Sequence, residues 1–154
     1  MGTYASSTEV SSDRSRAEIE RTLSRWGADS FAYMTNRSQA QIAFEYDGKR
    51  IRFVLPLPDR DSREFTLTPT GKARVRSASD AAYEQAVRQK WRALNLVVKA
   101  KLEAVESGIS TFEQEFYANV VLPNGQTVFE ATSPQVAQMI SVGDRGPLML
   151  ETLR

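Results

Sequence analysis

The segment from Asp80 to Gly108 constrains the fold most, because its large apolar residues recur in steps of three or four. This spacing places them on one stripe of an α-helix. Small residues form a second line, and charged residues fill the remaining arc. A helix with these three faces packs against two neighbours, so the sequence predicts a long central helix. The bulky stripe consists of Tyr83, Val87, Trp91, Leu94, Val98, Leu102, Val105 and Ile109.

The line of small residues on this helix bears on assembly. Ala86, Ala93 and Ala100 recur every seven residues, a spacing that lets a second helix approach closely. We expect the first helix of the same chain to fill this groove. The alternative is a homodimer through the long helices, with these three alanines as the oligomer interface.

A helix and an antiparallel meander are predicted before the central helix. Ser15 and Glu18 form a capping-box pattern that starts the first helix, and Gly27 is placed to end it. Residues 1–13 are expected to be a flexible tail, and residues 14–150 a single α+β domain.

The hairpin in this meander can be assigned a register. Asp47-Gly48 is typical of a two-residue type I′ turn between strands. The turn places Glu45 opposite Arg50 on the outer face, with Arg52 beside them. The inner pairs are then Phe44 with Ile51, Ile42 with Phe53, and Ala40 with Leu55.

Shorter elements complete the predicted order. Leu55–Pro58 ends the third strand, since proline cannot donate a ladder hydrogen bond. The remaining expectations are a short strand at Phe65–Thr68, a basic linker over Gly71–Ser79, a helix capped by Ser110 and Glu113, a brief strand at Thr127–Phe129, and a last helix that starts at Ser133-Pro134 and ends at Gly143. The order helix, three-stranded antiparallel meander, long helix and smaller C-terminal helices predicts an α+β fold.

Missing residue types exclude several chemistries. The chain has no histidine and no cysteine, so it offers no imidazole base, thiolate nucleophile or zinc site of the usual kind. Pro58-Asp59 lacks the Glu-x-Lys that would follow it in a common nuclease class. We therefore expect a protein that is not an enzyme and takes no cofactor or metal, although a magnesium site built from carboxylates alone stays chemically open. No apolar run is long enough to cross a bilayer.

Charge is distributed unevenly along the chain. Residues 49–101 contain thirteen basic and five acidic residues, a net charge of +8, whereas residues 102–154 carry −5. An outer sheet face with arginines beside a basic linker suits a phosphate backbone. The predicted nucleic-acid-binding residues are Arg50, Arg52, Lys72, Arg74 and Arg76. Two simpler interpretations together have about the same weight as nucleic-acid binding. In one, the charges only keep the surface soluble; in the other, the basic centre docks on the acidic C-terminal part of the same chain.

Several segments together carry a resemblance. They are residues 15–21 with Gly27-Ala28, residues 50–58, residues 91–94 with 98–105, and Thr111–Glu113 with Leu122–Gly125. In these segments the chain resembles a group of small uncharacterised proteins encoded by bacteriophages and environmental viral genomes. The resemblance implies a viral setting, in the cytoplasm of an infected bacterial host, and supplies no activity.

Two functions follow as hypotheses. The leading one is a non-enzymatic, phage-type protein that binds DNA or RNA through the central basic region. The alternative is a protein-interaction module, such as a viral inhibitor of host machinery or an assembly subunit, with a host or viral protein as partner. For that alternative, Glu103, Glu106, Glu113 and Glu115 are candidates for an acidic surface that mimics nucleic acid.

Overall fold

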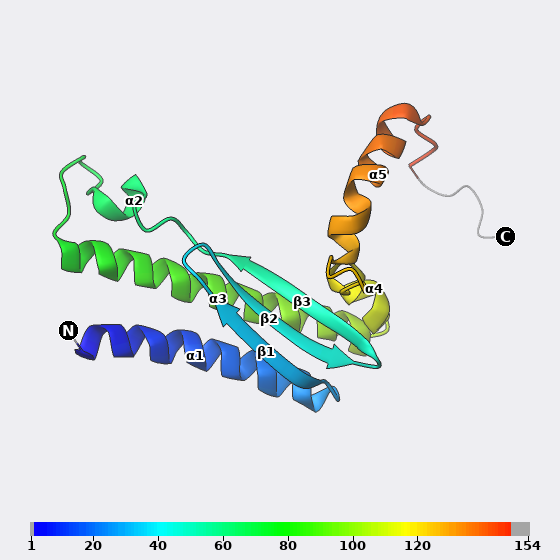
Figure 1. The fold of residues 1–154 in the computed structure, drawn as a ribbon, viewed down its shortest axis with the longest axis horizontal. Helices are drawn as coiled ribbons and strands as arrows, with labels where there is room; N and C mark the ends of the chain where they lie inside the picture. Colours follow the sequence, from blue (N-terminus) through cyan, green and yellow to red (C-terminus); the bar gives the residue numbers. More distant parts are fainter. Residues whose placement is uncertain (1, 149–154) are drawn as a thin grey trace.

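The computed structural model describes the backbone of residues 2–148 and the side chains of residues 12–148. It confirms the predicted α+β architecture, drawn in Figure 1. A long N-terminal helix is followed by a three-stranded antiparallel sheet, a long helix and smaller C-terminal helices. The elements are α1 (Gly2–Arg25), β1 (Asp29–Thr35), β2 (Gln39–Tyr46), β3 (Lys49–Pro56), α2 (Arg63–Thr66), α3 (Arg76–Glu106), α4 (Phe112–Phe116), the 3-10 helix η1 (Tyr117–Asn119) and α5 (Val128–Val142).

The hairpin register is the one that the sequence predicts. Asp47 and Gly48 have φ values of 50° and 71°, as a type I′ turn requires. Phe44 then pairs with Ile51, and Glu45 pairs with Arg50. The period of two therefore sends the apolar set of β2 and β3 to one face of the sheet. That face lies on α1 and α3, which pack side by side (Figure 1).

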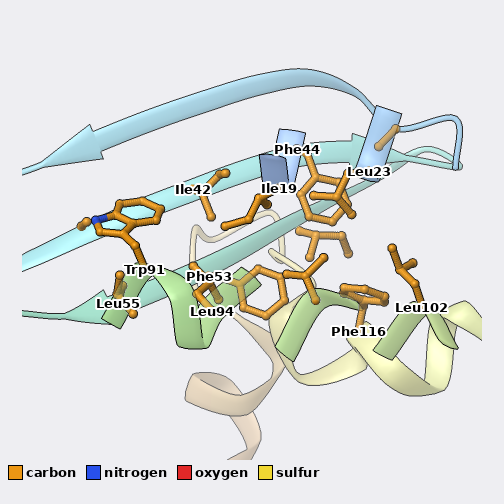
Figure 2. Packing of buried hydrophobic residues seen from close by; sticks show 14 residues of the cluster. Ile19, Leu23, Ile42, Phe44, Phe53, Leu55, Trp91, Leu94, Leu102 and Phe116 are labelled. Atoms are coloured by element: carbon orange, nitrogen blue, oxygen red, sulfur yellow. The ribbon is translucent and has the colours of Figure 1, made fainter. Parts of the chain in front are cut away.

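The core fills the space between this sheet face and the helices (Figure 2). Ile19 and Leu23 of α1 are fully buried in it, and Phe116 joins from α4. The ring of Phe116 meets Phe44 and Phe53 edge-on, with centroids 6.1 and 6.0 Å apart. Phe116 thus attaches the C-terminal part of the chain to the sheet.

The central helix starts earlier than its apolar stripe indicates. α3 begins at Arg76, inside the predicted linker, and ends at Glu106, where Gly108 with φ 78° completes a C-terminal cap. Trp91, Leu94, Val98 and Leu102 of the predicted stripe are buried, whereas Ile109 lies beyond the helix and is exposed.

The start of the first helix was predicted wrongly. α1 begins at Gly2, so Ser15 lies inside the helix and does not cap it. No glycine or proline occurs between residues 3 and 14, and serine and threonine cost a helix only a few tenths of a kcal/mol each. Once nucleated, the helix continues through them. The flexibility expected of residues 1–13 concerns dynamics and stays a prediction.

Four later assignments were also wrong. Residues 63–66 form α2 in place of a strand, because Phe65 is buried with its ring edge-on to Tyr83 of α3, 5.6 Å away. Thr111 and Gln114 form the capping box of α4, one residue after the predicted pair. The last helix begins at Val128, six residues before Pro134, because the Thr127 and Glu130 side chains close a capping box there, so Val128 and Phe129 are helical and do not form the predicted strand at Thr127–Phe129. Its end at Gly143 was predicted correctly.

Candidate functional site

The five predicted phosphate-binding residues do not form one patch. Arg50 and Arg52 lie on β3 at the end of the sheet near α4 and α5. Lys72, Arg74 and Arg76 lie at the other end of the molecule, between α2 and the start of α3 (Figure 1). The chain order places these residues close in sequence, but β3 and the connection after it carry them apart.

Several of these side chains already have partners. Arg50 pairs with Glu45 across the hairpin at 2.9 Å. Arg52 donates to the Gly125 carbonyl at 2.9 Å and lies 3.5 Å from Glu130. Arg74 donates from Nε to the Leu67 carbonyl at 2.9 Å. Arg52 and Arg74 thus hold the polypeptide together locally. Nucleic-acid binding through the five residues as a set stays a prediction without a shared surface to support it.

One of the four glutamates of the acidic surface predicted for protein binding makes contacts within the chain. Glu115 is half-buried; it accepts from Ser110 Oγ at 2.6 Å and lies 3.9 Å from Lys101. Glu103, Glu106 and Glu113 are exposed.

The three alanines of the predicted oligomer interface on α3 differ in burial. Ala86 is half-buried, whereas Ala93 and Ala100 are exposed, so α1 does not cover the groove over its whole length. Leu96 and Val97 lie between these two alanines on the same side of the helix, with 61% and 44% of their surface exposed. We call Ala93, Leu96, Val97 and Ala100 the α3 stripe.

The helix α5 exposes much more apolar surface. No residue of α5 is buried, and it projects away from the sheet and from α3 (Figure 1). Phe129, Val136, Met139 and Ile140 share one face through steps of seven, three and four. They are exposed to 63%, 48%, 70% and 66%. We call these four residues the α5 stripe. In an isolated chain this stripe is exposed to solvent.

The base of α5 is held firmly although the rest of the helix is not covered. Thr127 is buried; its hydroxyl oxygen accepts from the Glu130 backbone N–H, and its own N–H donates to the Glu130 carboxylate. The Val128 N–H donates to the Val120 carbonyl at 2.9 Å. Arg52 reaches both Gly125 and Glu130. These contacts fix the direction in which α5 leaves the domain.

Sequence reasoning missed the α5 stripe as a surface. Its spacing was visible from Phe129 to Ile140, but the Ser133-Pro134 pair was read as the helix start and divided the stripe. The Thr127…Glu130 pattern was the signal that would have joined its two parts.

A third feature is a polar groove between α1 and α3. It is lined by Ser15 and Glu18 of α1, by Gln85, Gln89 and Asn95 of α3, and by three arginines, Arg14, Arg88 and Arg92. Sequence reasoning counted Arg88 and Arg92 in the basic segment but did not connect them with Arg14.

Comparison with protein-family models, curated proteins and solved structures finds no match for this chain. Within the part of the chain that the structure describes, no helix has the length and apolarity needed to cross a membrane. The same residues contain no group of three or more carboxylates placed to hold a metal ion.

Proposed function

We propose that this protein is an assembly subunit, in which the α5 stripe of one copy packs on the α3 stripe of a second copy. The observation that carries this proposal is the exposure of four large apolar side chains along one face of a projecting helix. An exposed contiguous apolar face on a protein surface is typical of an interaction site.

The partner of the α5 stripe is inferred from a second exposed stripe, the α3 stripe, on the same chain. The α3 stripe is itself helical and unpartnered, and its alanines let another helix axis come close. The α3 stripe from Ala93 to Ala100 covers about two turns, and the α5 stripe from Phe129 to Ile140 covers about three. Each copy therefore carries both stripes, and two copies can cover them reciprocally in a twofold dimer.

Packing of α5 on its own α3 stripe is disfavoured by the base of the helix. The Thr127–Glu130 capping box and the contacts of Arg52 direct α5 away from α3 (Figure 1). Folding back would break these contacts. Association with a second copy keeps them.

The apolar area is large enough to drive association. Complete burial of a Val, Ile, Met or Phe side chain contributes about 1.5–3 kcal/mol. With the observed exposures, covering one α5 stripe contributes roughly 4–7 kcal/mol, and a reciprocal dimer gains this twice. The cost of association is of the order of 4–15 kcal/mol, so the burial of both stripes matches this cost in magnitude, and we expect the dimer to form at high protein concentration.

Light scattering coupled to size exclusion tests the proposal. We expect the wild type to be a dimer at high concentration, and the double variant Met139→Glu/Ile140→Glu to be a folded monomer. The matched control, Gln135→Glu/Gln138→Glu, adds the same charge to the same helix outside the stripe and keeps the dimer. A monomeric wild type, or equal dissociation in both variants, contradicts the proposal.

A further inference from the structure

The groove between α1 and α3 gathers positive charge from two helices. Arg14 comes from α1, and Arg88 and Arg92 come from successive turns of α3. From this convergence we propose that the groove binds a phosphate group. This site differs from the five residues that the sequence suggested and is independent of the α5 stripe.

Among the residues whose side chains the structure describes, no carboxylate forms an ion pair with any of the three arginines. None of the ion pairs among residues 12–148 includes Arg14, Arg88 or Arg92. Within residues 12–148, the hydrogen bond that this set of arginines makes joins Arg88 to the neutral Gln85 side chain. Like charges at positions i and i+4, as in Arg88 and Arg92, destabilise a helix slightly. An anion between them removes that repulsion.

The single carboxylate in the groove has its own cation. Glu18 accepts from Lys99 Nζ. That bond and the charge of Lys99, with a further hydrogen bond from Asn95, hold the pKa of Glu18 below its usual value. Glu18 is therefore ionised and paired near neutral pH, which leaves the positive charge of the three arginines in excess.

The groove also contains an unsatisfied polar atom. Asn95 is 7% exposed, and its Oδ1 is buried with no hydrogen-bond partner. A buried acceptor without a donor is costly. An arginine drawn inward by an anion provides such a donor, as does the hydroxyl of a monoprotonated phosphate. Ligand binding thus satisfies a group that the protein alone leaves unpaired.

The size of the groove limits the ligand. Its volume is about 260 Å³, below the 300–1,000 Å³ range of sites that enclose drug-sized molecules. A space of this size holds one or two phosphate groups. Arginine binds phosphate oxygens bidentately. The source is either a free phosphate or pyrophosphate ion, or the phosphodiester backbone of a nucleic acid lying along the groove.

Three probes distinguish these sources. Calorimetry with inorganic phosphate and with pyrophosphate measures free-anion binding, and anisotropy with a fluorescent oligothymidylate measures backbone binding, all at about 50 mM salt. In Arg88→Gln/Arg92→Gln, we expect the affinity for the recognised probe to fall about tenfold or more. The control Arg25→Gln/Arg63→Gln removes the same charge from exposed positions outside the groove and should change affinity less than twofold.

The pattern of losses identifies the ligand. Binding of phosphate or pyrophosphate that only the groove variant loses indicates a free anion; the same loss for the oligonucleotide indicates a phosphodiester. Arg14→Gln, a change on the other helix, should repeat the effect and guards against a local defect in α3. No binding of any probe to the wild type overturns the proposal, as does equal weakening in the groove variant and its control.

Discussion

Arg52 is the sharpest test of the difference between a phosphate ligand and a structural contact. Its guanidinium donates to the Gly125 carbonyl at 2.9 Å and lies 3.5 Å from Glu130, and its side chain is 23% exposed. A hydrogen bond from a charged group contributes about 1.5–3 kcal/mol when buried, and less here because water reaches the site. We expect Arg52→Met to lower the free energy of unfolding by about 1–2 kcal/mol.

Arg50 provides the matched control on the same strand. It pairs with Glu45 at 2.9 Å but is 64% exposed, and exposed ion pairs contribute about 0.2–1 kcal/mol. Arg50→Met should therefore cost clearly less than Arg52→Met in urea unfolding followed by circular dichroism.

A double-mutant cycle divides the Arg52 effect between its two partners. Glu130→Gln removes the charge but keeps a side chain that can complete the capping box with Thr127. We expect a coupling of about 0.2–1 kcal/mol between Arg52→Met and Glu130→Gln, so that most of the loss belongs to the Gly125 carbonyl. Equal losses for Arg50→Met and Arg52→Met would refute the structural role of Arg52.

Three further predictions concern the core, the α5 cap and acid stability. Phe116→Ala should lower the free energy of unfolding by about 3–5 kcal/mol. Phe129→Ala in the exposed α5 stripe should change it by less than about 1 kcal/mol in the monomer. Similar losses for the two variants in chemical denaturation would contradict the assigned burial. Thr127→Ala removes the cap of α5 and should cost about 0.5–2 kcal/mol, measured together with the loss of helical signal. The pKa of Glu18 is lowered from 4.5 by Lys99, so its contribution to stability is complete above pH 4.5 and is lost as pH falls through the lower folded value. Glu18→Gln should flatten the dependence of melting temperature on pH below 4.5, and an unchanged slope would argue against the pair.

The sheet was predictable because two local signals agreed. Alternation in β2 and β3 and the Asp47-Gly48 turn specify the same register independently, and Glu45 opposite Arg50 follows from it. The four buried apolar residues on the core-facing side of α3, Trp91, Leu94, Val98 and Leu102, followed from helical spacing alone. Burial of one face of each element determines both patterns, and this information is local in the sequence.

Helix starts and surfaces were less predictable. Two capping patterns competed at Thr127 and Ser133, and the sequence alone did not show which would close. The basic residues were grouped by sequence distance, but the run of β3 separates Arg52 from Lys72, and the pairing of α1 with α3 brings Arg14 to Arg88. Contacts of this kind depend on tertiary packing, which no periodicity within one segment reports.

Intermolecular disulfide formation tests the central claim most directly, because the chain has no native cysteine. Ile140→Cys and Val97→Cys chains are mixed and oxidised, with Gln138→Cys replacing Ile140→Cys as the control. If α5 of one copy packs on the α3 stripe of another, the mixture yields the Ile140–Val97 heterodimer in preference to either homodimer, and the control does not. A predominant Val97–Val97 homodimer would instead indicate pairing of two α3 helices, and no crosslink above the control level would show that α5 does not dock there.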